Sequence, residues 1–191
     1  MPTDIEVRQN EVVVVGGSRM AEVSSMFTMG MNPCIGLVLW SKEMCAVGHF
    51  HDWEKTPIAQ CGVVVKQFCR VSSPNSRRAV IVMATVTEPD KAWHSEAMKV
   101  DLDKVVPLAY EVVKPAAVAN VKISLKDGKL DYNFAYENGT KLARTPIDNW
   151  TARPTGADFL VIGVFGSPDK IQYVKGNQPE QLNQVLTIAL A

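Results

Sequence analysis

A cysteine, two histidines and a threonine fall in the first third of the chain, and their side chains could support nucleophilic catalysis. Thr28 and Cys34 are followed by His49 and His51, all within residues 26–53. A cysteine thiolate attacks a carbonyl carbon when a neighbouring imidazole accepts the thiol proton. These residue types therefore raise the hypothesis of a Cys-His nucleophile and base pair.

Two short β-strands must bring these side chains together. Residues 35–40 (IGLVLW) and 45–51 (CAVGHFH) are apolar, β-prone runs, and the polar residues 41–44 between them can turn. An antiparallel hairpin is therefore expected over residues 35–51.

Pairing Trp40 with Cys45 across the turn sets the register of this hairpin. Cys34 then lies directly opposite His51 and diagonal to His49. Because side chains alternate between the faces of a strand, the cysteine and both histidines share one face. Opposed residues have Cβ atoms about 5 Å apart and diagonal ones are about 7–8 Å apart, so the thiol is within reach of either imidazole.

The backbone around Cys34 contains several residues that break regular structure. Gly30 and Asn32-Pro33 interrupt the chain just before the cysteine, as expected where backbone curls around a small group. Gly36 and Gly48 flank the pair without side chains, which predicts room for a substrate. The alternative is packing, because an unmodified cysteine often serves as a small buried hydrophobe.

Composition limits the classes of protein to consider. Twenty acidic and twenty basic residues cancel, so no strong field is expected to draw the chain to nucleic acid or to an anionic membrane. No apolar run is long enough to predict a transmembrane helix, and the first residues lack the pattern of a signal peptide. The four cysteines show no C-x-x-C spacing, which favours thiols over a disulfide framework or a zinc site.

The remaining pattern predicts one domain over residues 1–191 with more strands than helices. Its mixed order favours an α/β or α+β fold, a β-sandwich of mixed sheets flanked by helices. Strands are expected over residues 5–15, 27–31, 79–86, 118–136 (a hairpin with an Asp-Gly turn), 159–165 and 171–174, and helices over 56–71, from Asp90, and over 101–113.

The stretch TMGMNPC (28–34), followed by IGLVLW and then His49, resembles the active-site region of the glutamine deamidase superfamily. That group includes the chemoreceptor deamidase CheD, the catalytic domain of the cytotoxic necrotizing factors and the Burkholderia lethal factor. The threonine six residues before the cysteine, the apolar strand and the later histidine follow the pattern of the group. The chain departs from it at Asn32-Pro33, where those families carry a glycine and serine pair. Phe27-Thr28 and residues 159–173 are most similar to the lethal factor.

The resemblance implies a protein-glutamine deamidase of the same fold that needs no metal or cofactor. Cys34 would be the nucleophile, His49 the base and Thr28 the residue that orients the imidazole. The backbone N–H of Cys34, with Asn32 and Pro33 beside it, would surround the oxyanion and the substrate. His51 is the rival base, since the hairpin register favours it and the family pattern favours His49.

The resemblance also implies a partner, which is a protein that presents an exposed glutamine. A toxin similar to the lethal factor would act as a monomer on a host translation-initiation RNA helicase. It would reside in the producer's cytoplasm, or be exported without a visible signal peptide to the host cytosol. The alternatives are a CheD-like deamidase of chemoreceptors and a non-catalytic α/β binding domain. Transglutamination, in which an amine replaces water, also stays open.

Overall fold

The computed structural model of this 191-residue chain describes residues 3–9, 11–50, 64–66, 68–85, 88–105, 108–132, 159–165, 171–175 and 178–181. These residues form two mixed β-sheets and a small number of helices, so the coarse expectation of an α/β fold built on mixed sheets is confirmed. The predicted helix over residues 56–71 falls mostly outside the described residues, although 64–66 and 68–71 are helical.

The smaller sheet has four strands in the order β1-β3-β8-β9. β1 runs parallel to β3, and the other neighbours are antiparallel. The strands are β1 (Thr3–Glu6), β3 (Val23–Met31), β8 (Ala119–Ser124) and β9 (Leu130–Asp131).

The larger sheet has eight strands in the order β12-β11-β10-β2-β5-β4-β6-β7. Only its β6–β7 pair is parallel among the pairs described. The strands are β2 (Glu11–Gly16), β4 (Ile35–Trp40), β5 (Met44–Phe50), β6 (Arg78–Met83), β7 (Glu111–Val113), β10 (Phe159–Phe165), β11 (Ile171–Lys175) and β12 (Gln178–Gln181).

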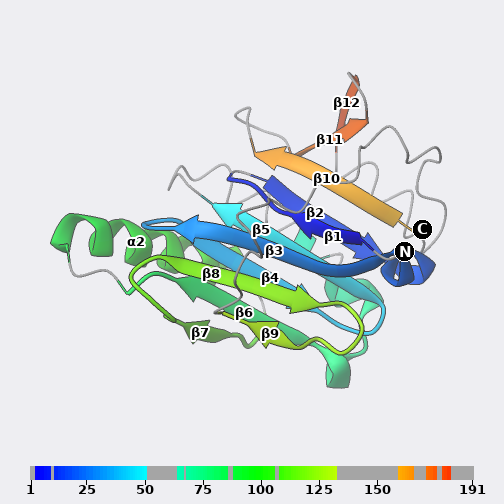
Figure 1. Ribbon diagram of the computed structural model, residues 1–191, viewed down its shortest axis with the longest axis horizontal. Helices are drawn as coiled ribbons and strands as arrows, with labels where there is room; N and C mark the ends of the chain where they lie inside the picture. The colour runs from blue at the N-terminus through cyan, green and yellow to red at the C-terminus, as the bar shows by residue number, and fades with distance from the viewer. Residues whose placement is uncertain are drawn as a thin grey trace, which may run out of the picture.

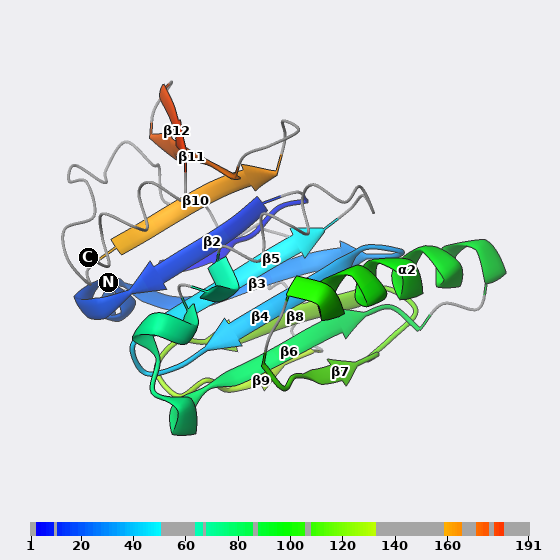
Figure 2. The same ribbon diagram turned by 180° about the vertical axis from the view of Figure 1, so that it is seen from behind.

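The sheets and helices stack in layers. The smaller sheet lies in front of the larger one in Figure 1, and helix α2 (Pro89–Val105) covers the opposite face of the larger sheet, as the reversed view in Figure 2 shows. Two short 3-10 helices are described: η1 (Gly17–Glu22) connects β2 to β3, and η2 (Pro74–Ser76) lies between the helical residues 68–71 and β6. No helix in the described part of the chain combines the length and apolar character needed to cross a bilayer.

The central strands β4 and β5 are buried on both faces, and their alternating side chains build two separate cores. One set, including Leu37, Leu39 and Ala46, packs toward the helical layer with Met98 and Leu102 of α2. The other set packs between the two sheets and consists of Val38, Cys45 and Val47 with residues of β3 and β8. The side chains of the predicted site belong to the strand faces that point between the sheets.

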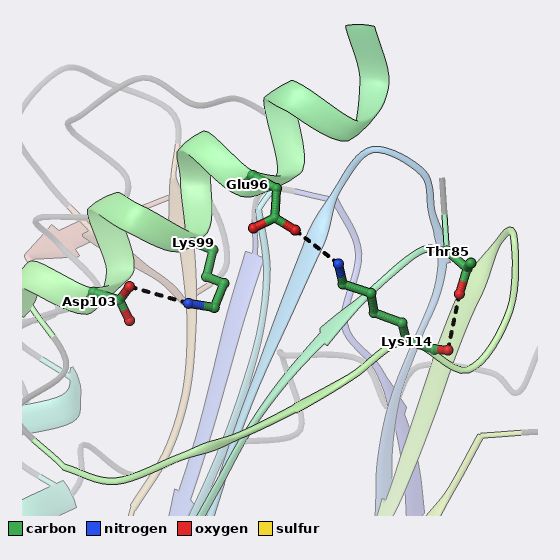
Figure 3. Close-up of polar contacts among 5 residues, drawn as sticks. All are labelled: Thr85, Glu96, Lys99, Asp103 and Lys114. Atoms are coloured by element: carbon green, nitrogen blue, oxygen red, sulfur yellow. Dashed lines mark hydrogen bonds and ion pairs between the residues drawn. The ribbon is translucent and has the colours of Figure 1, made fainter. Parts of the chain in front are cut away.

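Helix α2 differs from the helical pattern expected from the sequence. It is one helix that runs from Pro89 to Val105, and the expected helix over 101–113 is wrong at its C-terminal end, since Glu111–Val113 form strand β7. A helix avoids the residue before a proline, and Pro107 stands in this segment. The ion pair between Lys114 Nζ and Glu96 Oε1, 2.9 Å long, joins the segment after β7 to α2 (Figure 3).

The hairpin expected over residues 118–136 is present as β8 and β9 where the chain is described. Its turn is held by hydrogen bonds from Gly128 N to Ser124 O and from Ser124 N to Lys129 O, both 2.9 Å long. Gly128 has a φ of +67°, a left-handed conformation that glycine adopts without strain. The Asp-Gly signal therefore marked this turn correctly.

Candidate active site

The β4–β5 hairpin has the register expected from the sequence. Trp40 pairs with Cys45, and Gly36 pairs with His49. Cys34 directly precedes β4, and extending this register by one residue would place it diagonal to His49. Its side chain belongs to the core between the sheets. His51 lies outside the described residues, so its predicted place opposite Cys34 stays a prediction.

A buried hydrogen bond links the predicted threonine and histidine. Thr28 Oγ1 lies 2.7 Å from His49 Nδ1, and the two side chains are 0% and 4% exposed. Thr28 stands on β3 of the smaller sheet and His49 on β5 of the larger one, so the contact crosses the space between the sheets. With Nδ1 engaged, the ring is fixed in orientation, and its other nitrogen, Nε2, is buried.

Cys34 lies in the same inter-sheet core. It is a reduced cysteine, 4% exposed, in the apolar cluster that includes Met31, Val38 and Val82. The residues before it are nearer the surface, since Gly30 is exposed and Asn32 and Pro33 are partly exposed.

The segment before Cys34 has an irregular backbone. In the β3–β8 ladder Thr28 pairs with Val121 and Met31 pairs with Ala119, so Met29 and Gly30 together face the single residue Asn120. This arrangement is a β-bulge, and Gly30 occupies it with a φ of +72°. The Asn32-Pro33 peptide bond is cis. The break that the sequence predicted before Cys34 is confirmed.

The glycines near the pair do not serve the role expected from the sequence. A Cβ on Gly36 would meet Met31 Sδ at 2.7 Å, and one on Gly48 would meet the Phe50 ring at 3.2 Å. The prediction that these glycines leave room for a substrate is therefore wrong, because large apolar side chains already occupy both positions. Close packing explains the missing side chains, between the two sheets at Gly36 and against Phe50 and Val12 of the same sheet at Gly48.

Asn32 is the second candidate for oxyanion stabilisation. Its Oδ1 is buried and has no hydrogen-bond donor among the described residues. A carbonyl oxygen accepts hydrogen bonds and cannot stabilise an anion, so only the Asn32 amide group or a backbone N–H could do so. Pro33 has no N–H and can contribute only shape.

Sequence reasoning missed Asn120 and Met31. Asn120 Oδ1 accepts a hydrogen bond of 2.9 Å from the N–H of Gly30, and Met31 packs over Gly36. Asn120 follows Gly30 by 90 positions, and no local pattern connects them. Only the pairing of β3 with β8 reveals the contact.

The other described cysteines differ from Cys34 in their surroundings. Cys45 is fully buried, and this burial raises the pKa of its thiol far above the ordinary value. Cys69 is partly exposed beside the helical layer. No group of three His, Cys, Asp or Glu side chains that could hold a metal ion occurs within the described ranges.

No protein-family model matches this sequence, and no curated protein matches it either.

Proposed function

We propose that the chain is a cysteine-dependent protein-glutamine deamidase, with Cys34 as nucleophile, His49 as base and Thr28 as the residue that orients the base. The observation that carries the proposal is the 2.7 Å contact between Thr28 Oγ1 and His49 Nδ1. It fixes the imidazole of His49, whose strand pairs with the strand that directly follows Cys34. A nucleophile, a base and a residue that orients the base are the three groups of a catalytic triad.

The chemistry uses the protein's own groups. His49 takes the proton of the Cys34 thiol, and the thiolate attacks the amide carbon of the glutamine side chain. The C–N bond breaks as the imidazolium gives its proton to the leaving ammonia. Water, deprotonated by His49, then attacks the thioester, which releases glutamate and restores the thiol.

Negative charge on the amide oxygen must be stabilised during both attacks. The backbone N–H of Cys34 is the nearest candidate, and one such donor contributes about 3–4 kcal/mol. Glutamine suits a nearly buried sulfur, because its amide stands at the end of a slender chain of methylene groups. A substrate approaching past residues 30–33 could extend that chain inward while its backbone stays outside.

Within the group, we favour a toxin similar to the Burkholderia lethal factor, acting on a host translation-initiation RNA helicase. The similarity of Phe27-Thr28 and of residues 159–173 supports this choice, and those later residues include the strands β10 and β11. A CheD-like enzyme would modify chemoreceptor glutamines instead, and a transglutaminase would pass the acyl group to an amine.

Mass spectrometry of candidate substrates tests the proposal. The purified chain is incubated with the helicase and, separately, with a chemoreceptor fragment, and each is digested and sequenced. We expect the mass of one glutamine to increase by the difference between –OH and –NH2. The substrate should stay unchanged when it is incubated with Cys34→Ser or His49→Ala. When a primary amine is added, glutamate should remain the major product, because a transglutaminase would instead attach the amine. Modification that persists in Cys34→Ser would contradict the proposal.

A non-catalytic binding domain is the second candidate, and the 4% exposure of Cys34 in an apolar cluster favours it. Iodoacetamide labelling separates the two functions. In the deamidase, Cys34 reacts faster than Cys69 near neutral pH despite its lower exposure, because an imidazole promotes the thiolate. Cys45 is the internal control, since burial raises the pKa of its thiol and blocks reaction. Labelling of Cys34 as slow as that of Cys45 would favour the binding domain.

A further inference from the structure

We infer that Asn120 is a positioning residue of the Cys34–His49 site, acting through the N–H of Gly30. The inference rests on the proposed function, and it adds a group that lies outside the nucleophile, base and orienting residue. Asn120 contacts the backbone of Gly30, and we assign it no direct part in the reaction. It holds the β-bulge that determines which side chains of β3 point toward them.

The bulge changes which residues of β3 face inward. In a regular strand, residues two apart share a face, so Thr28 would share its face with residue 30 and not with residue 31. The extra residue opposite Asn120 shifts this alternation, and both Thr28 and Met31 are fully buried. Met31 and Cys34 belong to the same inter-sheet core, on the side to which Val121 and Ala119 also contribute.

The two inward side chains of β3, Thr28 and Met31, each make a specific contact. Thr28 contacts His49, and Met31 fills the space over Gly36, the residue paired with His49. A slip of β3 by one residue would remove the hydroxyl from the imidazole and turn the methionine outward. It would also change where the chain enters the segment that leads to Cys34.

The Asn120 side chain is suited to holding the bulge. An extra residue in a strand leaves an N–H without a ladder partner, and the 2.9 Å hydrogen bond to Asn120 Oδ1 satisfies that of Gly30. The backbone of Gly30 is left-handed, and no atom lies within 4 Å of where its Cβ would be. Asn120 alternates with the buried residues Ala119 and Val121 and is only partly buried. Truncating it therefore removes a hydrogen bond while the core stays intact.

The experiment compares Asn120→Ala with Asn120→Asp, which keeps an acceptor oxygen at the same place. Lys122→Ala is the matched control, since Lys122 stands two residues further along the same face of β8. The readouts are the rate of Cys34 alkylation from pH 6 to 9 and the 15N signals of the His49 ring. Thermal unfolding reports the fold of each variant.

We expect Asn120→Ala to slow Cys34 alkylation about tenfold, the equivalent of losing one hydrogen bond of about 1.4 kcal/mol, with the Cys69 rate unchanged. The His49 ring signals should shift, and Asn120→Asp and Lys122→Ala should both behave like the parent chain. Two results would overturn the inference: unchanged His49 signals in Asn120→Ala, or an Asn120→Asp variant as impaired as Asn120→Ala.

The failure of the proposed function would look different. If Cys34 in the parent chain labels as slowly as Cys45, the deamidase proposal fails. The His49 ring signals then still report whether Asn120 positions Thr28 and the imidazole, because they need no reactive thiol.

Discussion

The Thr28–His49 hydrogen bond is the feature on which the candidate site depends at the scale of single residues. A hydroxyl and a ring nitrogen that are both buried would each lose free energy without a partner, and here Thr28 Oγ1 and His49 Nδ1 are partners of one another. Threonine is β-branched, so its χ1 angle is restricted on a strand and its hydroxyl holds one direction. The imidazole is therefore oriented before any substrate arrives.

Replacing Thr28 tests this orientation. Thr28→Val keeps the shape and removes the hydroxyl, leaving a buried ring nitrogen without that partner, at a cost of about 1–3 kcal/mol. We expect deamidation to slow by about 10- to 100-fold, since each 1.4 kcal/mol is a factor of ten in rate. Steady-state kinetics and chemical denaturation measure the two effects. Thr28→Ser, which keeps the hydroxyl, should retain most activity, and equal loss in both variants would contradict the orienting role.

The residue types of the site could be predicted from the sequence, but their surroundings could not. Thr28, Cys34 and His49 lie close together in the sequence, so one hairpin and the strand before it are enough to predict that they meet. Gly36 looked like empty space because a sequence shows a missing side chain and not the neighbour that fills it. Met31 covers that position from the other sheet.

At the scale of elements, the β8–β9 turn is attached to the larger sheet. The indole of Trp40 lies against Gly128, and its Nε1 donates a 3.1 Å hydrogen bond to Leu125 O. Arg78 Nη1 donates another, also 3.1 Å long, to Gly128 O. Trp40 ends β4, the strand that begins just after Cys34, so this contact anchors the far end of the strand that follows the candidate nucleophile.

A double-mutant cycle measures this attachment. Gly128→Ala should destabilise the fold by more than the about 1–2 kcal/mol of left-handed strain, because its Cβ would meet the Trp40 ring at 2.6 Å. In a Trp40→Leu background the cost should fall to the strain alone. Gly30→Ala is the control for strain, since its φ is +72° and its Cβ would meet nothing. Urea denaturation gives each value, and equal costs for Gly128→Ala in both backgrounds would refute the contact.

Sequence patterns predicted most of the strands, but they failed where one segment could form either a helix or a strand. The Asp-Gly turn and the alternating strands around it are local signals, and the structure follows them. The segment 101–113 combines the end of a helix with the β-prone residues Glu111–Val113, which pair with β6. Pairing with a distant strand decided its conformation, and helical periodicity could not reveal that partner.

At the scale of the whole molecule, the site lies where the two sheets meet. Met31 of the smaller sheet packs against Gly36 of the larger one, and Thr28 reaches His49 beside them. The distance between the sheets therefore controls whether the hydroxyl meets the imidazole. This arrangement depends on packing between two different sheets, and the pattern of a single sequence does not show how the sheets pack.

Coupling between Met31 and Gly36 tests the fit of the sheets. Met31→Ala should cost about 2–5 kcal/mol by leaving a cavity, and Gly36→Ala should also destabilise, since its Cβ would lie 2.7 Å from Met31 Sδ. The double variant should be more stable than the sum predicts, because the added methyl occupies vacated space. Gly48→Ala, which meets Phe50 instead, should combine additively with Met31→Ala. Calorimetry measures the parent chain and the five variants, and additivity in both pairs would contradict this packing of Met31 over Gly36.

The position of β2 in the larger sheet has a consequence for folding during synthesis. β2 lies between β5 and β10, so Val12 is paired with Gly48 on one side and with Gly163 on the other. During synthesis, the hairpin that carries His49 can join β2 early, while the second edge of β2 must wait until the ribosome has made β10. Distant pairings of this kind close slowly. Until β10 is made, the valine-rich strand β2 therefore has one unpaired edge, and we expect a chaperone to bind the nascent chain there.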